Sequence, residues 1–484
     1  MPTGNIRKNY IYNLSFQIFS LLIPFITAPY VSRVLLPEGI GTYSYVNSIA
    51  TYFSLFAALG LSSYGTREVS RVRDNRKKTS KLFWELSALR LLSTVLCLGL
   101  YLGFILISGS DMRTYLAAGV VILSVGVDCN WFFQAMENFK VLMVRNFLVK
   151  LISVVCIFLF VNGPEDLVLY FLIQGGGTFL SNVVLRAQLI KAVDWIPAKH
   201  WRFGRHLRET LVYFIPTIAT SVYTLLDRTM IGVITKDMAA NGYYEQAHKM
   251  VNMLMTVITS LNVVVGVRTS YLFGQNKKKE IREHIYNTFR FMFMMAFPLA
   301  AGLMACAADF VPWFYGDGYE PTIPLMVLFA PLLFIIGISN VLGSLYLTPS
   351  GQRARSNRAI IIGAVCNFVL NLILIPIPSL GVYGAVIASL AAELVISILY
   401  LSFSARFISA ARVLGTGLRY LLLAAGMFVP TFLVGKLREP AVSTTLLQIA
   451  VGVTVYIVLL ILTRDPAWRD VKKFLIGKFK KTTD

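Results

Sequence analysis

The chain of 484 residues has few charged side chains, few acids and very few histidines. Only 14% of its residues are Asp, Glu, Lys or Arg, against roughly 25% in soluble domains, and 24 acids face 45 bases. Hydrophobic residues make up 56% of the sequence. A soluble domain needs more polar surface than this composition supplies, so we expect an integral membrane protein.

The cysteines and histidines show no pattern of a disulfide framework or a zinc site. All five cysteines lie within apolar stretches and lack paired spacing, and the four histidines are scattered. We therefore expect no metal and no cofactor. A Gly-rich phosphate loop with Lys, a GxSxG elbow and an HExxH helix are missing as well, which argues against an enzyme. We expect the acids Asp309, Asp317 and Glu320 to lie in a solvated outer loop.

Long apolar stretches dominate what is present. A helix that crosses the hydrocarbon layer needs roughly 20 apolar residues. The sequence predicts an all-α membrane protein with fourteen such helices, at 11–33, 43–64, 83–108, 114–134, 143–162, 167–186, 210–234, 243–266, 287–308, 323–347, 359–377, 382–404, 415–435 and 443–463.

The bases gather on one side of these stretches. They concentrate in residues 67–81, 199–208 and 277–282 and in the tail from Arg464. The positive-inside rule then places both termini in the cytoplasm, and it explains the net charge of +21 without nucleic acid. Arg7 and Lys8 precede an apolar run that is too long for a cleavable signal, so we expect the first helix to be retained.

Six predicted helices precede the basic connection, which allows a parallel repeat of two six-helix bundles. The two halves share a Gly–Tyr pattern at a helix start, "GTYSYV" after Arg33 and "GYYEQA" after Arg228. The predicted organisation is a lobe at 1–190, a basic linker at 191–209, a second lobe at 210–410, two further helices within 411–463, and a basic tail at 464–484.

Charged residues inside the apolar stretches are the candidate functional residues, because each costs roughly 2.5–3.5 kcal/mol at a helix centre unless it faces water or a partner. Arg90 and Lys150 could instead snorkel, Glu85 is expected at the interface, and Asp128 could simply pair with one of those bases. Nine ionisable residues of the predicted spans are the candidates: Glu85, Arg90, Asp128, Lys150, Asp227, Arg228, Glu245, Lys249 and Glu393.

This polar set favours a transporter over a receptor, an anchor or a scaffold. Glu245 and Lys249 are four residues apart and can pair along one helix face, and Glu393 can protonate and so couple ion movement. A drug exporter of the MATE type would carry cations and prefer acids in its cavity. With Arg33 included, the bases here are at least as numerous as the acids, which favours an anionic load.

Several stretches resemble the polysaccharide-unit flippases of bacteria, the Wzx-like branch of the MOP superfamily. They follow the family's order over most of the chain: "PYVSRVLLPEGIGTYSYV", "GLSSYGTREVSRVRDNR", "DCNWFFQAMENFK", "YTLLDRTMIG", "GYYEQAHKMVN" and "NFVLNLILIP". The resemblance implies two lobes around a central cavity and alternating access. It implies transport of an isoprenoid-pyrophosphate-linked oligosaccharide to the outer leaflet of the cytoplasmic membrane, with membrane lipids, a polymerase and glycosyltransferases as partners. A lipid II or teichoic-acid precursor flippase is the nearest alternative.

The quoted motifs match the family's motifs residue by residue, and the resemblance implies that the matched residues form the site. We expect Arg33, Arg228 and Lys249 to hold the diphosphate, and Arg67 and Arg90 to serve the opening toward the cytoplasm. The chain departs from the family at Leu36, where a glycine is usual, and at Val267–Arg268. The matched positions are Arg33, Arg67, Asp128, Trp131, Gln134, Glu137, Asp227, Arg228, Tyr244, Lys249 and Glu393. The sequence does not specify the oligosaccharide, the coupling ion, the oligomeric state or the pathway.

Overall fold

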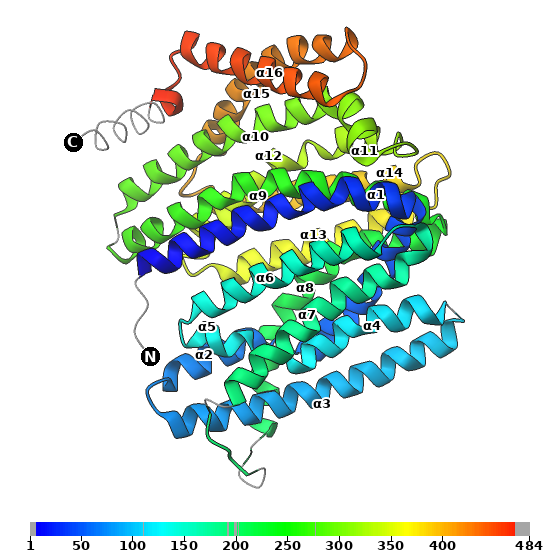
Figure 1. The fold of residues 1–484 in the computed structure, drawn as a ribbon. Helices are drawn as coiled ribbons and strands as arrows, with labels where there is room; N and C mark the ends of the chain where they lie inside the picture. Colours follow the sequence, from blue (N-terminus) through cyan, green and yellow to red (C-terminus); the bar gives the residue numbers. More distant parts are fainter. Residues whose placement is uncertain are drawn as a thin grey trace, which may run out of the picture. The chain divides into compact units, whose positions relative to one another are not determined.

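Helices form all the regular secondary structure of the described residues, which confirms the predicted all-α class (Figure 1). The computed structural model describes residues 6–109, 111–190, 193–197, 201, 203–275 and 277–469, without the side chains of 6–22, 203, 215–216, 219–220, 222–223, 260–264, 267–268 and 270. The departure at Val267–Arg268 therefore lies outside the described side chains. The chain divides into two compact units, Met1–Gly242 and Tyr243–Asp484. The lobe boundaries expected from the sequence stay a prediction.

Unit 1 holds the helices up to the start of α9. They are α1 (Ile6–Ala58), α2 (Leu61–Val72), α3 (Arg76–Ser108), α4 (Met112–Val127), α5 (Asn130–Ala135), α6 (Phe139–Phe160), the 3-10 helix η1 (Pro164–Asp166), α7 (Leu167–Ile190), α8 (Phe203–Thr235) and the first residues of α9 (Met238–Gly274).

Unit 2 holds the rest of α9 and the remaining helices. They are α10 (Lys278–Tyr315), α11 (Thr322–Phe329), α12 (Leu332–Leu342), the π-helix η3 (Gly343–Leu347), α13 (Arg353–Leu374), α14 (Val382–Ser404), α15 (Ala410–Lys436) and α16 (Val442–Leu462).

Each predicted span lies mostly on helical residues. In the described part of the chain, eleven stretches are long and apolar enough to cross a membrane. The α1 element contains the predicted span at 11–33 and most of the one at 43–64, and α8 and α9 cover the predicted spans at 210–234 and 243–266. The protein is thus a multi-pass membrane protein, and the number fourteen stays a prediction.

A sharp break at Leu36 divides α1 into two helices. Its backbone has φ 59° and ψ 171°, a combination that glycine adopts easily and that costs other residues about 1–3 kcal/mol. Pro37 follows directly, and a proline disfavours the helical conformation of the residue before it. The leucine that stands where the resemblance expects a glycine therefore lies at the break itself.

Two glycines allow a close backbone contact between α1 and the first turn of α9, within unit 1. A Cβ atom on Gly41 would lie 1.7 Å from the carbonyl oxygen of Met238, and one on Gly242 would lie 2.0 Å from that of Pro37. Each glycine thus faces the carbonyl located four residues before the other glycine.

In unit 1, α4 packs against α1, α3 and α7, and α2 packs against α5. The buried Tyr101 of α3 donates a hydrogen bond to the carbonyl of Tyr115 in α4 at 2.7 Å. Where α2 meets α5, the ring of Trp131 lies over Gly65, and a Cβ there would approach the indole to 2.6 Å. The first contact holds the start of α4 against α3, and the second holds the start of α5 against α2.

In unit 2, α10 packs against α12, α15 and α16. Asp309 of α10 is buried and accepts a hydrogen bond from the Gln448 amide of α16 at 2.8 Å. The expectation of a solvated loop was therefore wrong for Asp309, because α10 continues to Tyr315 and carries this carboxylate into the helix packing. It holds for the exposed Asp317 and Glu320.

Candidate functional site

A buried ion pair joins α3 to the turn between α4 and α5. The guanidinium of Arg90 is 1% exposed and donates to the Asp128 carboxylate at 2.5 Å and to the Asp128 carbonyl at 2.9 Å. It also donates to the Ser62 hydroxyl of α2 at 2.8 Å. The snorkelling alternative for Arg90 was therefore wrong, and Asp128 pairs with one of the two bases that the sequence offered.

The residues around Asp128 set its position. The α4 helix ends at Val127, and Asp128 has an extended backbone with φ −65° and ψ 127°. One carboxylate oxygen accepts the backbone N–H of Asn130 at 3.0 Å and its side-chain amide at 2.5 Å. The other oxygen is then directed to Arg90. The first residues of the "DCNW" motif thus form a local turn that presents a carboxylate to α3.

Two further arginines lie around this pair. Arg145 of α6 donates to the side-chain oxygens of Asn130 at 2.9 Å, Asn146 at 2.6 Å and Asn182 at 3.3 Å. Arg186 of α7 donates to the carbonyl of Gly126 at 3.2 Å. Neither has a carboxylate within salt-bridge distance among the residues that the structure describes.

These four side chains form what we call the guanidinium cluster: Arg90, Asp128, Arg145 and Arg186. Arg145 lies within electrostatic reach of Asp128, and Arg186 within reach of Arg90. Three guanidinium groups and one carboxylate leave two positive charges without a matching acid. In a low-dielectric environment such an excess is costly, so the cluster is suited to receive an anion.

A second buried network lies close to the start of α8. His206 contacts the Glu85 carboxylate through Nε2 at 3.0 Å and the Tyr64 hydroxyl through Nδ1 at 2.8 Å, and Lys81 lies 3.9 Å from the same carboxylate. Glu85 is 3% exposed. The sequence placed Glu85 at the interface, but packing of α3 against α2 and α8 encloses it.

An exposed ion pair connects α2 to the turn between α5 and α6. Arg73 donates to the carboxylate of Glu137 at 2.7 Å. This hydrogen bond raises the pKa of Arg73 above its ordinary value. Glu137, one of the positions carried over from the resemblance, has a positive φ of 55°. In this structure Glu137 therefore forms an ion pair with the residue that follows α2.

The other expected site residues of unit 1 lie on α1, α2 and α8. Arg33 is exposed and comes three residues before the break at Leu36. Arg67 is exposed, and its guanidinium donates to the hydroxyl of Tyr213. Asp227 is buried, whereas the neighbouring Arg228 is half-buried. The backbone carbonyl of Arg228 accepts a hydrogen bond from the side-chain amide of Asn241 at 3.0 Å.

In unit 2 the structure pairs Glu245 with Lys249 along α9, at 3.5 Å. This is the acid-first spacing of four residues that the sequence indicated. Glu393 is half-buried on α14. The predicted roles of these residues in substrate binding or ion coupling stay predictions.

Sequence reasoning missed Arg145, Arg186 and His206. Two of these were left out because the expected spans began at 143 and ended at 186, which placed both arginines at membrane ends. The helices extend further, since α6 begins at Phe139 and α7 runs to Ile190. His206 was set aside as one of four scattered histidines, because its partners Tyr64 and Glu85 are more than a hundred residues away.

The described residues contain no group of three or more His, Cys, Asp and Glu side chains that could hold a metal ion. The cluster itself is built from guanidinium, amide and carboxylate groups. Such groups bind anions through charge-assisted hydrogen bonds.

Comparison with known proteins identifies the family. Residues 6–266, more than half of the chain, match the family described as "Polysaccharide biosynthesis protein". The chain belongs to this family. It is 23% identical over 409 residues to a protein of Escherichia coli (strain K12) named "Putative O-antigen transporter", covering 82% of this chain and 96% of that protein. A protein of the same name from Shigella dysenteriae is 23% identical over 396 residues, covering 81% and 98%.

Solved structures place this polysaccharide biosynthesis protein in the fold of the MOP superfamily. The lipid II flippase MurJ in an inward closed conformation superposes with a TM-score of 0.75 at 15% identity, covering 94% of this chain and 99% of that chain. An inward-facing multidrug resistance MATE transporter has a TM-score of 0.62 at 13% identity, covering 84% and 98%. The chain thus shares the fold of these transporters.

Proposed function

We propose that this protein flips an isoprenoid-pyrophosphate-linked oligosaccharide repeat unit from the inner to the outer leaflet of the bacterial cytoplasmic membrane by alternating access. Both termini are cytoplasmic in this proposal, and the product feeds capsule, O-antigen or exopolysaccharide synthesis. The protein performs no bond chemistry itself. A polymerase and glycosyltransferases of the same pathway act before and after it.

The excess positive charge of the guanidinium cluster is the observation that carries this proposal. A diphosphate and hydrophilic sugars cannot cross hydrocarbon unaided, whereas the lipid tail can stay in the bilayer. The headgroup needs a cationic, hydrogen-bonding environment among the helices. Arg145 and Arg186 offer guanidinium groups whose protein partners are neutral amides and carbonyls, and arginine presents a planar fork that matches phosphate oxygens.

The same observation weighs against one of the two rival functions, and a growth phenotype separates the other. A MATE-type exporter of cationic drugs would be disfavoured by two unmatched guanidinium groups among its helices. A lipid II flippase carries a chemically similar anionic headgroup and shares the fold. It differs in that its loss would stop cell growth, whereas loss of a repeat-unit flippase would remove only the surface polymer.

Surface polymer in a deletion strain tests the proposal. Plasmid-borne protein should restore the polymer, and Arg186→Gln should reduce it by about tenfold, the effect of one lost charge-assisted contact. Arg113→Gln is the matched control, because Arg113 is an exposed arginine of the same unit outside the cluster. In proteoliposomes, the protein should also move a fluorescent lipid-linked saccharide across the bilayer. Absence of that movement for the purified wild type would overturn the proposed function.

A further inference from the structure

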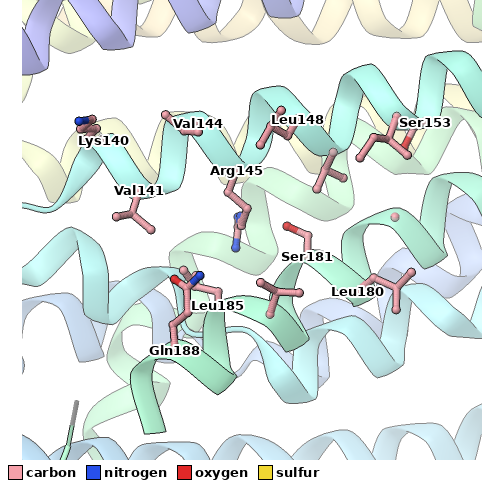
Figure 2. Close-up of a pocket in the computed structure, with 14 residues that line it drawn as sticks. Lys140, Val141, Val144, Arg145, Leu148, Ser153, Leu180, Ser181, Leu185 and Gln188 are labelled. Carbon is pink, nitrogen blue, oxygen red and sulfur yellow. The ribbon is translucent and has the colours of Figure 1, made fainter. Parts of the chain in front are cut away.

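A groove between α6 and α7 lies directly beside the guanidinium cluster, entirely within unit 1. It has a volume of about 670 Å³ and runs along α6 from Lys140 to Ser153 (Figure 2). Thirteen residues of helix span about 20 Å, roughly two thirds of the hydrocarbon thickness of a bilayer. The groove is therefore longer than one leaflet is deep.

The walls of the groove are aliphatic and open. Five of its lining side chains are 49% to 63% exposed: Val144, Leu148, Ile152, Leu180 and Val184. Exposed apolar side chains on a membrane helix face lipid chains, and a concave strip of them holds one chain more closely than a flat surface does.

One end of the groove is cationic. Arg145 belongs both to the groove and to the guanidinium cluster, and it points from α6 toward α7, where Ser181 and Gln188 lie (Figure 2). Lys140 adds a second positive charge at the first turn of α6. An occupant with an apolar chain and a phosphate at its end would match both parts of the groove. Basic pockets between membrane helices are known as sites for anionic lipid headgroups.

We propose that this groove holds the prenyl chain of the carrier lipid, with the diphosphate at Arg145 and Lys140. The inference rests on the proposed function and specifies where its substrate docks. We favour the carrier over a membrane phospholipid because Arg145 connects the groove to the guanidinium cluster. A diphosphate at this point contacts a cluster with two unmatched positive charges, which suits a more highly charged group than a phosphodiester.

Photolabelling of the full-length protein in phosphatidylethanolamine nanodiscs tests the inference. The probe is a polyprenyl diphosphate with a diazirine in its chain, and labelled peptides are mapped by mass spectrometry. Labels should map to α6 and α7. Unlabelled polyprenyl diphosphate should compete, and an equal concentration of phosphatidylglycerol should not.

Two tryptophan variants form a matched pair. Leu148 lines the groove and Leu151 does not, although both are exposed leucines of α6, at 49% and 43%. Leu148→Trp should fill the groove and lower labelling about tenfold, whereas Leu151→Trp should leave it within about twofold. Arg145→Gln should weaken competition by polyprenyl diphosphate about tenfold, the effect of one charge-assisted contact.

Each outcome has a defined meaning. Labels outside α6 and α7, or unchanged labelling in Leu148→Trp, overturn the groove as the docking site. Equal competition by phosphatidylglycerol overturns the choice of the carrier lipid, and unchanged competition in Arg145→Gln overturns the placement of the diphosphate. Proteoliposome flipping is measured in parallel. Flipping without groove labelling rejects only this inference, whereas labelling without flipping rejects the proposed function.

Discussion

Substitution of Gly41 by alanine probes the closest backbone contact of unit 1. The added Cβ would lie 1.7 Å from the carbonyl oxygen of Met238 and 2.7 Å from the backbone nitrogen of Gly242. Both neighbours are main-chain atoms, so rotation of a side chain cannot relieve the clash. We expect α1 and the first turn of α9 to move apart in Gly41→Ala.

The size of the effect follows from the distances. Contacts of a Cβ closer than 3.0 Å are essentially never found, so the two helices must separate by at least 1.3 Å, from 1.7 to 3.0 Å. Overpacking of this kind costs about 1–3 kcal/mol, occasionally more. Replacing glycine in a helix by alanine returns about 0.5–1 kcal/mol. With the middle of each range, the net loss in the free energy of unfolding should be about 1 kcal/mol.

Thermal melting of the purified protein in detergent measures the loss. Gly103→Ala is the control, because Gly103 lies in the interior of α3, where an added Cβ would have no atom within 4 Å. That variant should be as stable as the wild type or more so. Gly41→Ala combined with Gly242→Ala should cost less than the sum of the two, since the first substitution already opens the contact. A Gly41→Ala protein that melts with the wild type refutes the close approach.

Four further predictions test other parts of the structure. Removing one partner of the buried pair, by Arg90→Met or Asp128→Asn, should cost about 3–5 kcal/mol in unfolding free energy, and the double variant should recover part of it; full additivity would contradict the pairing. Arg228→Ala should abolish surface polymer at unchanged protein abundance on immunoblots, and Arg228→Lys should restore it only in part, because the bidentate fork is lost. Wild-type polymer in Arg228→Ala would remove this residue from the site. Leu36→Gly should raise the melting temperature by relieving about 1 kcal/mol of backbone strain, and an unchanged temperature would show that the break is not strained. Asp111→Ala should lose about 1 kcal/mol of helix capping at pH 7. Hydrogen bonds from the first turn of α4 lower the pKa of Asp111 below its ordinary value of 3.8. The capping carboxylate therefore stabilises the fold above pH 3.8 and loses this effect as the pH falls through the folded-state pKa, so the difference in stability from wild type should vanish in acid.

The helical class and the approximate helix positions could be predicted because hydrocarbon imposes a length and a composition on every span. The pair of Glu245 and Lys249 could be predicted too, since residues four apart share one helix face. Both inferences depend on local spacing. The structure differs from the prediction where the position of a helix end determines a residue's environment. Asp309 was expected in a loop, but α10 continues past the predicted end of the span and includes this residue.

The guanidinium cluster could not be found by local reasoning. Its side chains come from α3, α6 and α7 and from the turn after α4, and no sequence pattern states that these segments meet. Arg145 and Arg186 look like the ordinary bases that flank membrane helices. Only the observed partners show that they turn inward, since their hydrogen bonds go to the amides of Asn130 and Asn182 and to the carbonyl of Gly126.

The asymmetry of charge within unit 1 links the fold to the proposed transport. A structural ion pair needs equal charges, and Arg90 with Asp128 supplies one. Arg145 and Arg186 exceed that need, and neutral amides and carbonyls satisfy their hydrogen bonds without cancelling their charge. An arginine held in this way keeps its positive field and remains able to exchange an amide for a phosphate oxygen, which accepts a stronger, charge-assisted bond. Binding is then reversible, because the amides take the guanidinium back when the anion leaves. A site that must load its anion on one side of the membrane and release it on the other requires this kind of exchange rather than a permanent carboxylate partner.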